Sequence, residues 1–202
     1  MRTRNSIAIA VMLACALPLA AAQAAGKGKK VARDYANTIA TLQTDMGDIQ
    51  IKFFYDKAPK HVENFVDLAA KGFYDGTLFH RVIPGFMIQG GDPNTKKPED
   101  PTRPYGTGGS ENKVKAEFND TSHKRGIVSM ARSSDPNSAS SQFFIVVKDS
   151  TFLDGQYSAF GEVISGMEIA DKIAAAPRGA NDRPNQPIHI KKVLLSQAKS
   201  SS

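Results

Sequence analysis

Residues 79–92 read FHRVIPGFMIQGGD, and their composition predicts two adjoining strands on which polar and apolar side chains alternate. Alternation places one cation, one glutamine and two large apolar groups around a single expected surface hollow: Arg81, Gln89, Phe86 and Met87. Three glycines in the stretch permit tight backbone turns. Taken by themselves, the apolar pair more often packs in a core, and a lone arginine more often forms a surface ion pair.

Short apolar runs bounded by Gly, Pro, Asp or Asn continue on both sides of this stretch and predict β-strands. They are residues 39–42 and 49–53, which form a hairpin across 45–48, then 78–83, 86–89, 126–130, 142–147, 160–164 and 188–195. Helical spacing predicts two amphipathic helices, one from Pro59 to a stop at Gly72 and one over residues 167–175. Many short strands and two helices favour a mainly β fold, closed into an antiparallel barrel because closure removes exposed edges.

Two long stretches, residues 92–119 and 133–141, fit no regular element, and such loops are usually functional or disordered. A second polar and aromatic cluster follows them, with SQFFI at 141–145 and FLDG at 152–155. Gln142 stands before a strand that reads as buried, so its amide needs hydrogen-bond partners or an exposed face. A structural role is the default interpretation of this residue taken alone.

The amino-terminal residues predict export. Two arginines precede an apolar run over residues 7–22, which ends in small residues with an Ala-x-Ala pattern at 22–24. Pro18 and the small residues favour a cleavable signal peptide over a membrane anchor. A lipoprotein site at Cys15, the sole cysteine, is an alternative that the short preceding stretch fits poorly, and cleavage after Ala24 leaves no thiol for catalysis.

The net charge of +6 is concentrated near this end of the chain. Beyond residue 34, 20 basic and 19 acidic residues remain, so the body is nearly neutral and no nucleic-acid partner is expected. The predicted organisation is a signal peptide at 1–24, a basic linker at 25–36, one domain at 37–197 and a polar tail at 198–202. No stable membrane anchor is expected.

Five motifs in sequence order resemble those of the cyclophilin family of peptidyl-prolyl cis/trans isomerases. The first is the stretch 79–92, with FHR, PGFM and QGGD inside it. The other four are GTGG at 106–109, SMA at 129–131, SQFFI at 141–145 and FLDG at 152–155. The similarity covers about residues 38–196, nearly the whole mature chain. It implies a closed eight-stranded antiparallel β-barrel capped by two α-helices, and an enzyme that accelerates rotation about Xaa-Pro bonds.

The same resemblance implies a site. It assigns catalytic roles to Arg81 and Gln89, and substrate binding to Phe86, Met87, Ala131, Arg132, Gln142, Phe144, Phe152, Leu153 and Tyr157. The apolar members would hold the proline ring, while Arg81 would donate to the proline nitrogen once twisting has removed its conjugation. Rotation about a bond needs no metal, nucleotide, other cofactor or covalent nucleophile.

Three positions depart from the best-known family members, and two of them, Phe152 and Tyr157, resemble bacterial secreted ones. Phe152 stands where many eukaryotic cyclophilins have tryptophan, Tyr157 where they have histidine, and Arg132 where asparagine is common. Losing an indole donor implies weaker binding of cyclosporin-like inhibitors. Alternation puts His80 on the opposite side of its strand from Arg81, which indicates a structural residue, and the other histidines lack the spacing of metal ligands.

The expected partners are proline-containing unfolded or partly folded polypeptides, bound by a monomer that is exported, to the periplasm if the host is Gram-negative. One alternative is a non-catalytic chaperone module that binds proline peptides in the same groove. Such a module would need the apolar pocket and not Arg81. A hydrolase using His80 is a further alternative, but it would require a nucleophile or metal partner that the sequence does not offer.

Overall fold

The computed structural model describes residues 34–198, and within them nine strands form one sheet. The strands are β1 Thr38–Thr44, β2 Gly47–Phe53, β3 Thr77–Leu78, β4 Arg81–Ile83, β5 Met87–Gly90, β6 Ile127–Met130, β7 Phe143–Val146, β8 Ala159–Ser165 and β9 His189–Gln197. The helices are α1 Pro59–Ala70 and α2 Met167–Ala174, with short 3₁₀ helices η1 Pro93–Lys96, η2 Pro136–Ser138, η3 Thr151–Leu153 and η4 Ala180–Asp182. None of the helices in these residues is long and apolar enough to cross a membrane.

The sheet is antiparallel throughout and has the order β3-β9-β1-β2-β8-β6-β7-β5-β4. The expected mainly β fold with two helices is confirmed, but a closed ring of eight strands is wrong in detail. The run at 78–83 is interrupted at Phe79 and His80, where the chain leaves β9 and turns to pair with β5. Its two parts, β3 and β4, therefore become the two ends of a strongly curled nine-stranded sheet, and no ladder joins them within the described residues.

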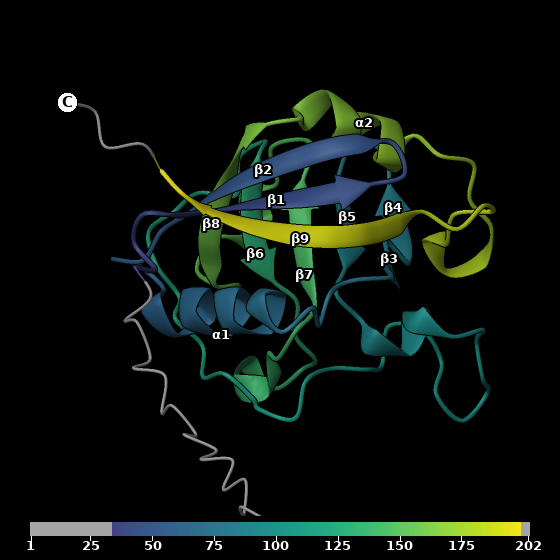
Figure 1. The fold of residues 1–202 in the computed structure, drawn as a ribbon, viewed down its shortest axis with the longest axis horizontal. Coiled ribbons are helices and arrows are strands. Elements are labelled where there is room, and N and C mark those ends of the chain that lie inside the picture. Colours follow the sequence, from purple (N-terminus) through teal and green to yellow (C-terminus); the bar gives the residue numbers. More distant parts are fainter. Residues whose placement is uncertain (1–33, 199–202) are drawn as a thin grey trace, which may run out of the picture. The chain divides into compact units, whose positions relative to one another are not determined.

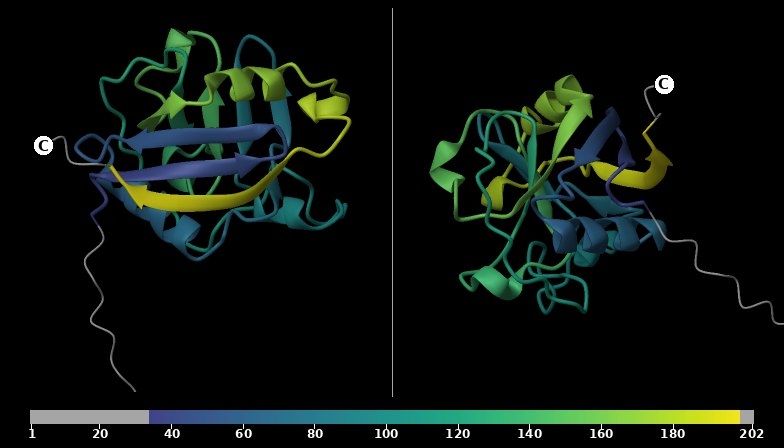
Figure 2. Two further views of the ribbon diagram at one scale, coloured as in Figure 1. Left: turned by 45° about the horizontal axis from the view of Figure 1, so that its top comes forward. Right: turned by 90° about the vertical axis from the view of Figure 1, so that its left-hand side faces the viewer.

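The two helices cover opposite sides of the curled sheet, with α2 above it and α1 below it in Figure 1, and Figure 2 gives two further views. Helix α1 packs against β8 and β9, and α2 against β2, β4 and β5. The inward face of α1 buries Val62, Phe65 and Val66 completely, as its helical spacing predicts. Phe65 lies at the centre of an aromatic cluster, with ring centroids 4.7 Å from Tyr74 and 5.3 Å from Phe143.

Strand β7 separates two apolar clusters. Phe143 and Ile145 belong to the main core, whereas Phe144 and Val146 belong to a smaller cluster with Met87 and other residues. This follows from the two-residue period of a strand, which sends successive side chains to opposite faces. The smaller cluster lies on the outer face of the sheet and forms the floor of the candidate site.

Several predicted segments lie outside the described residues. These are the signal peptide at 1–24, the first nine residues of the linker at 25–36 and the last four of the tail at 198–202. The predicted domain at 37–197 falls within the described part of the chain.

Candidate active site

Strand register brings the predicted site residues of three strands into one row. Arg81 of β4 lies directly opposite Gln89 of β5, and Gln89 lies opposite Phe144 of β7. Directly opposed residues of an antiparallel pair project to the same face. A cation, an amide and an aromatic ring therefore stand side by side on the outer face of the sheet.

These side chains open into a cavity of about 190 Å³. It is lined by Arg81, Phe86, Met87, Gln89, Ala131, Arg132, Phe144, Leu153 and Tyr157, nine of the eleven residues that the resemblance implies. Phe152 lies at its rim with 65% of its surface exposed, its ring centroid 5.5 Å from that of Phe86. A larger cavity of about 430 Å³, between α1 and residues 112–117, is lined mainly by charged side chains of both signs.

The floor of the smaller cavity is apolar and firmly packed. Met87, Phe144 and Leu153 are each more than nine-tenths buried and pack together. Tyr157 meets Phe144 edge to face, with ring centroids 5.6 Å apart. The floor thus offers a rigid apolar surface to a compact ring, with the Arg81 cation beside it.

A chain of amide hydrogen bonds orients Gln89. The Nε2 group of Gln142 donates to the carbonyls of Gly106, at 2.9 Å, and Gly108, at 2.7 Å. Its Oε1 must then accept, and it does so from Nε2 of Gln89 at 2.9 Å. Oε1 of Gln89 is left facing Nη1 of Arg81 at 3.5 Å. The loop at 106–108 therefore determines which end of the Gln89 amide meets the guanidinium.

Close packing keeps that loop in reach of Gln142. A Cβ at Gly108 would lie 2.1 Å from Oδ1 of Asp92, so only glycine permits the approach. Both carboxylate oxygens of the buried Asp92 are used, since Oδ1 accepts from the Asn94 N–H and Oδ2 from the N–H groups of Gly106 and Gly108. Asp92 of the QGGD motif therefore binds the backbone of the GTGG motif directly.

A second cavity of about 380 Å³ adjoins the first and shares Gln89, Ala131 and Arg132 with it. The Arg132 guanidinium lies 4.8 Å from the Tyr157 ring centroid, and its Nε and Nη2 donate to the Gln156 carbonyl at 3.1 Å. The side chain is therefore fixed along the wall between the cavities. The backbone of Ala131 is fixed as well, because its N–H donates to the Gln142 carbonyl at 2.9 Å.

His123 supports the apolar floor, a role that the sequence analysis missed. Its buried ring stacks on Phe144 with centroids 6.2 Å apart, while Nδ1 lies 3.0 Å from Asp154 and Nε2 lies 3.1 Å from the Ser129 hydroxyl. Ser129 is completely buried, so this Ser-His-Asp arrangement has no access to substrate. Asp154 and Ser129 lie within the FLDG and SMA motifs, but nothing in the sequence joins either to His123.

His80 lies apart from the site, in the wall of a different cavity that also includes Tyr105 and Arg183. Its ring is buried beside the Leu78 backbone. Burial lowers the pKa of His80, Asp92 and the Leu78 backbone oppose this shift, and the nearby Arg183 and Arg81 reinforce it. A buried neutral imidazole on the far side of the strand has no geometry for acting on a substrate beside Arg81.

Each of the other histidines pairs with one carboxylate: His61 with Glu117, His123 with Asp154 and His189 with Asp45. In the part of the chain that the structure describes, no group of three or more histidine, cysteine, aspartate or glutamate residues is placed to hold a metal ion.

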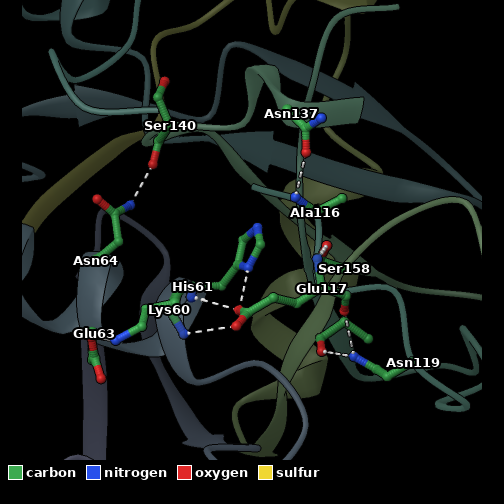
Figure 3. A network of polar contacts seen from close by, with 11 residues as sticks. Lys60, His61, Glu63, Asn64, Ala116, Glu117, Asn119, Asn137, Ser140 and Ser158 are labelled. Atoms are coloured by element: carbon green, nitrogen blue, oxygen red, sulfur yellow. Dashed lines mark hydrogen bonds and ion pairs between the residues drawn. The ribbon is translucent and has the colours of Figure 1, made fainter. Parts of the chain in front are cut away.

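A polar network ties the loops behind the site to α1 (Figure 3). The Glu117 carboxylate accepts from the backbone N–H groups of Lys60 and His61, and Asn64 donates to the carbonyl of Ser140. Ser140 lines the second cavity and lies two residues before Gln142. The irregular stretches at 92–119 and 133–141 are therefore anchored, although they contain little regular structure.

The match to a family model decides the identity. Residues 39–194 match the model described as cyclophilin type peptidyl-prolyl cis-trans isomerase/CLD. The chain belongs to the cyclophilin family. It is a peptidyl-prolyl cis-trans isomerase, and this class of enzyme needs no cofactor because its reaction is rotation about a bond.

Named relatives agree with this assignment. A probable peptidyl-prolyl cis-trans isomerase of Brucella abortus is 43% identical over 196 residues, covering 95% of each chain. Peptidyl-prolyl cis-trans isomerase A of Dickeya dadantii is 42% identical over 168 residues, covering 81% of this chain and 84% of its own. A cyclophilin of Cryptosporidium parvum, solved in the presence of the dipeptide Ala-Pro, has a TM-score of 0.71 and 33% identity, over 79% of this chain and 99% of its own.

Proposed function

We propose that this cyclophilin accelerates rotation about Xaa-Pro bonds in exported proteins and so assists their folding. One observation carries the assignment of roles: the Arg81 guanidinium and a rigid apolar floor line the same small cavity. The Cryptosporidium cyclophilin solved in the presence of Ala-Pro supports a proline-containing peptide as the occupant. The partners are then unfolded or partly folded chains, in which Xaa-Pro bonds populate both isomers.

The barrier to be lowered is about 18 to 20 kcal/mol and comes from resonance between the carbonyl and the proline nitrogen. No bond is made or broken, so the enzyme must bind the twisted state better than either planar state. Phe86, Met87, Phe144 and Leu153 hold the proline ring on the apolar floor. With the ring fixed, the chain on one side of the bond turns relative to the other.

Arg81 supplies the selective interaction. Twisting removes the conjugation of the proline nitrogen and frees its lone pair, which becomes a hydrogen-bond acceptor only near the transition state. A permanently charged donor aimed at that nitrogen stabilises the transition state and not the planar states. Gln89, oriented through Gln142, accepts from Nη1 and holds the guanidinium toward the cavity.

The remaining residues bind the substrate chain. The Ala131 backbone lies where the two cavities meet, and Gln142 lines the second of them, so both border a peptide that crosses between the cavities. Arg132 and Tyr157 form the dividing wall, and Phe152 extends the apolar surface at the rim. Exposed Phe152 lacks an indole donor, so we expect weaker binding of cyclosporin-like inhibitors than in members with tryptophan there.

The decisive experiment compares the mature protein with an Arg81→Ala variant. Cis to trans conversion of a short proline peptide is followed by exchange NMR, and peptide affinity is measured on the same samples. We expect a loss of about 100-fold or more in kcat/KM with peptide binding largely kept. Arg103→Ala, which alters a half-exposed arginine paired with Asp100 outside both cavities, is the control and should keep the full rate.

The same comparison tests the binding-module alternative. A protein that binds the peptide but does not accelerate exchange would be such a module, with the apolar floor as its working part. An Arg81→Ala variant that keeps the full isomerase rate would instead leave the enzyme intact and disprove the role of Arg81.

Export rests on the amino-terminal pattern at residues 1–24. We expect cleavage after Ala24 and delivery of a monomer to the periplasm in a Gram-negative host. Amino-terminal sequencing of the protein from a periplasmic extract would give Ala25 as its first residue. A full-length chain that stays with the membrane fraction would contradict this expectation.

A further inference from the structure

Arg81 has a second polar partner, on the side away from Gln89. Its Nε lies 3.6 Å from Oδ2 of Asp182, in the loop that joins α2 to β9. Gln89 approaches Nη1 on another edge of the same guanidinium. Two neighbours thus define the plane of a long side chain that is 43% exposed and would otherwise rotate freely.

The backbone at Asp182 is strained. Asn181 and Asp182 have φ angles of 59° and 56°, the only positive values at non-glycine residues within 34–198. Two consecutive residues in this region cost free energy, and such strain persists only where the surrounding structure enforces it. The group that this backbone conformation places at the site is the Asp182 carboxylate, which lies beside Arg81.

The loop is braced on both sides of Asp182. Arg178 Nε donates to Oδ1 of Asp182 at 3.2 Å, so the two carboxylate oxygens face different arginines. Gly179 N–H donates to the Arg183 carbonyl at 2.8 Å, which closes the turn around Asp182. The Arg183 side chain pairs with Glu99 and stacks over Tyr105, 4.7 Å from its centroid.

We propose that Asp182 is a positioning residue for Arg81, holding the Nε edge of the guanidinium so that other donors stay directed at the proline nitrogen. This inference rests on the role proposed for Arg81. A guanidinium has five N–H donors, and the contacts with Gln89 and Asp182 leave several of them without a hydrogen bond in the described residues. Fixing the side chain beforehand reduces the ordering needed when the transition state forms.

Asp182→Asn is the most informative change, because asparagine tolerates the left-handed backbone and keeps the shape while removing the charge. The geometry at Arg81 is used only in the transition state, so we expect kcat to fall by about two- to five-fold, the range of an exposed ion pair, with KM unchanged. We also expect the Nε–Hε resonance of Arg81 in a ¹⁵N–¹H spectrum to shift. Asp171→Asn, which breaks the Arg125 pair on α2, is the matched control and should change neither quantity.

The outcomes separate this inference from the proposed function. Unchanged kcat and an unchanged Arg81 resonance in Asp182→Asn, while Arg81→Ala is inactive, would overturn the positioning role alone. Full activity in Arg81→Ala would remove both. An Asp182→Asn effect of equal size on the residual rate of Arg81→Ala would show that Asp182 acts without Arg81, which also overturns the inference.

A second variant covers a loss of folding in Asp182→Asn. Arg178→Gln removes the brace on Oδ1 and leaves the Asp182 carboxylate in place. We expect the Arg81 resonance to shift in the same direction by a smaller amount. No shift in this folded variant would count against the positioning role.

Discussion

The Glu117 carboxylate accepts hydrogen bonds from both the backbone N–H and the ring Nδ1 of His61, at 3.0 and 2.7 Å. Helix α1 needs this contact, because its N-cap residue, Ala58, provides no side-chain acceptor. The first N–H groups of a helix have no partner inside the helix, and a negative charge there also complements the helix dipole. A residue from a distant loop thus completes the helix that covers one end of the curled sheet.

Glu117→Ala should lower the free energy of unfolding by about 1 to 2 kcal/mol, the usual cost of losing an N-cap. Urea unfolding followed by circular dichroism measures the change. Glu111→Ala, at an exposed position in the same loop whose side chain makes no hydrogen bond or ion pair in the described residues, is the control. Equal midpoints for both variants would show that Glu117 does not cap the helix in solution.

Acid should destabilise the fold through two buried histidines. Burial lowers the pKa of His61, partly offset by Glu117, and burial also lowers the pKa of His80 from the usual 6.5. Below pH 6.5 these histidines are protonated in the unfolded chain but stay neutral in the native protein. The stability present above that pH is therefore lost as the pH falls toward the lowered native-state pKa values. Thermal melts from pH 7.5 to 5 should show a falling Tm, with a shallower fall for His80→Leu. A constant Tm in wild type would contradict the prediction.

Tyr74→Phe should stabilise the protein by about 1 kcal/mol, since its buried hydroxyl has no hydrogen-bond partner in residues 34–198. Burial raises the pKa of this hydroxyl, as expected for a group removed from water. The ring contacts with Phe65 are kept in phenylalanine. Tyr55→Phe, which loses a hydrogen bond to Glu63, is the matched control and should not gain stability. A lower Tm for Tyr74→Phe would indicate a partner such as a buried water.

Gln142→Met keeps the size of the side chain and removes the amide that orients Gln89. We expect kcat/KM to fall by about ten-fold, since two hydrogen bonds to carbonyls and one to Gln89 are lost together. Gln50→Met, on the exposed side of β2, controls for the substitution itself. A rate equal to wild type would mean that Gln89 is held without Gln142.

Phe152→Trp should tighten the binding of a cyclosporin-like inhibitor while changing turnover by less than about two-fold, because one hydrogen-bond donor is added at the rim and the floor is untouched. Inhibition constants measured beside kcat/KM test both parts. Phe118→Trp, at another exposed phenylalanine, should leave the inhibition constant unchanged. An equal effect of both variants would point to non-specific contact with the inhibitor.

Local patterns predicted the elements well, because alternation and helical spacing record which side of each segment is buried. The hairpin at 39–53, both helices and most strands follow from them. The break at Phe79 did not, because both parts of the run 78–83 are apolar and the turn between them depends on two different partner strands. The 3₁₀ helices were missed because each is only three or four residues long, although η1 and η2 begin with a local signal, an Asp-Pro-Asn sequence whose aspartate accepts from the N–H two residues on.

Prediction from local sequence patterns reaches the same limit at the candidate site. Motif resemblance predicted most of the residues that line the cavity and the contact of Gln89 with Arg81, but not the loop at 106–108 or Asp182. Gly106 and Gly108 contact Gln142 although more than thirty residues of chain, including β6, lie between them, and Asp182 lies beside Arg81 although about a hundred residues separate them. Contacts of this kind depend on how the chain returns to the site, and no short-range pattern encodes them.

The two faces of strand β7 can be varied separately in protein engineering. Its odd and even side chains belong to different clusters, with Phe143 and Ile145 in the main core and Phe144 and Val146 in the smaller cluster that forms the floor of the candidate site. Saturation libraries at 144 and 146 should change which peptides are turned over while most members stay folded. Libraries at 143 and 145 should yield mainly insoluble protein. Mutations selected for an altered substrate range can therefore be confined to one face of a single four-residue strand.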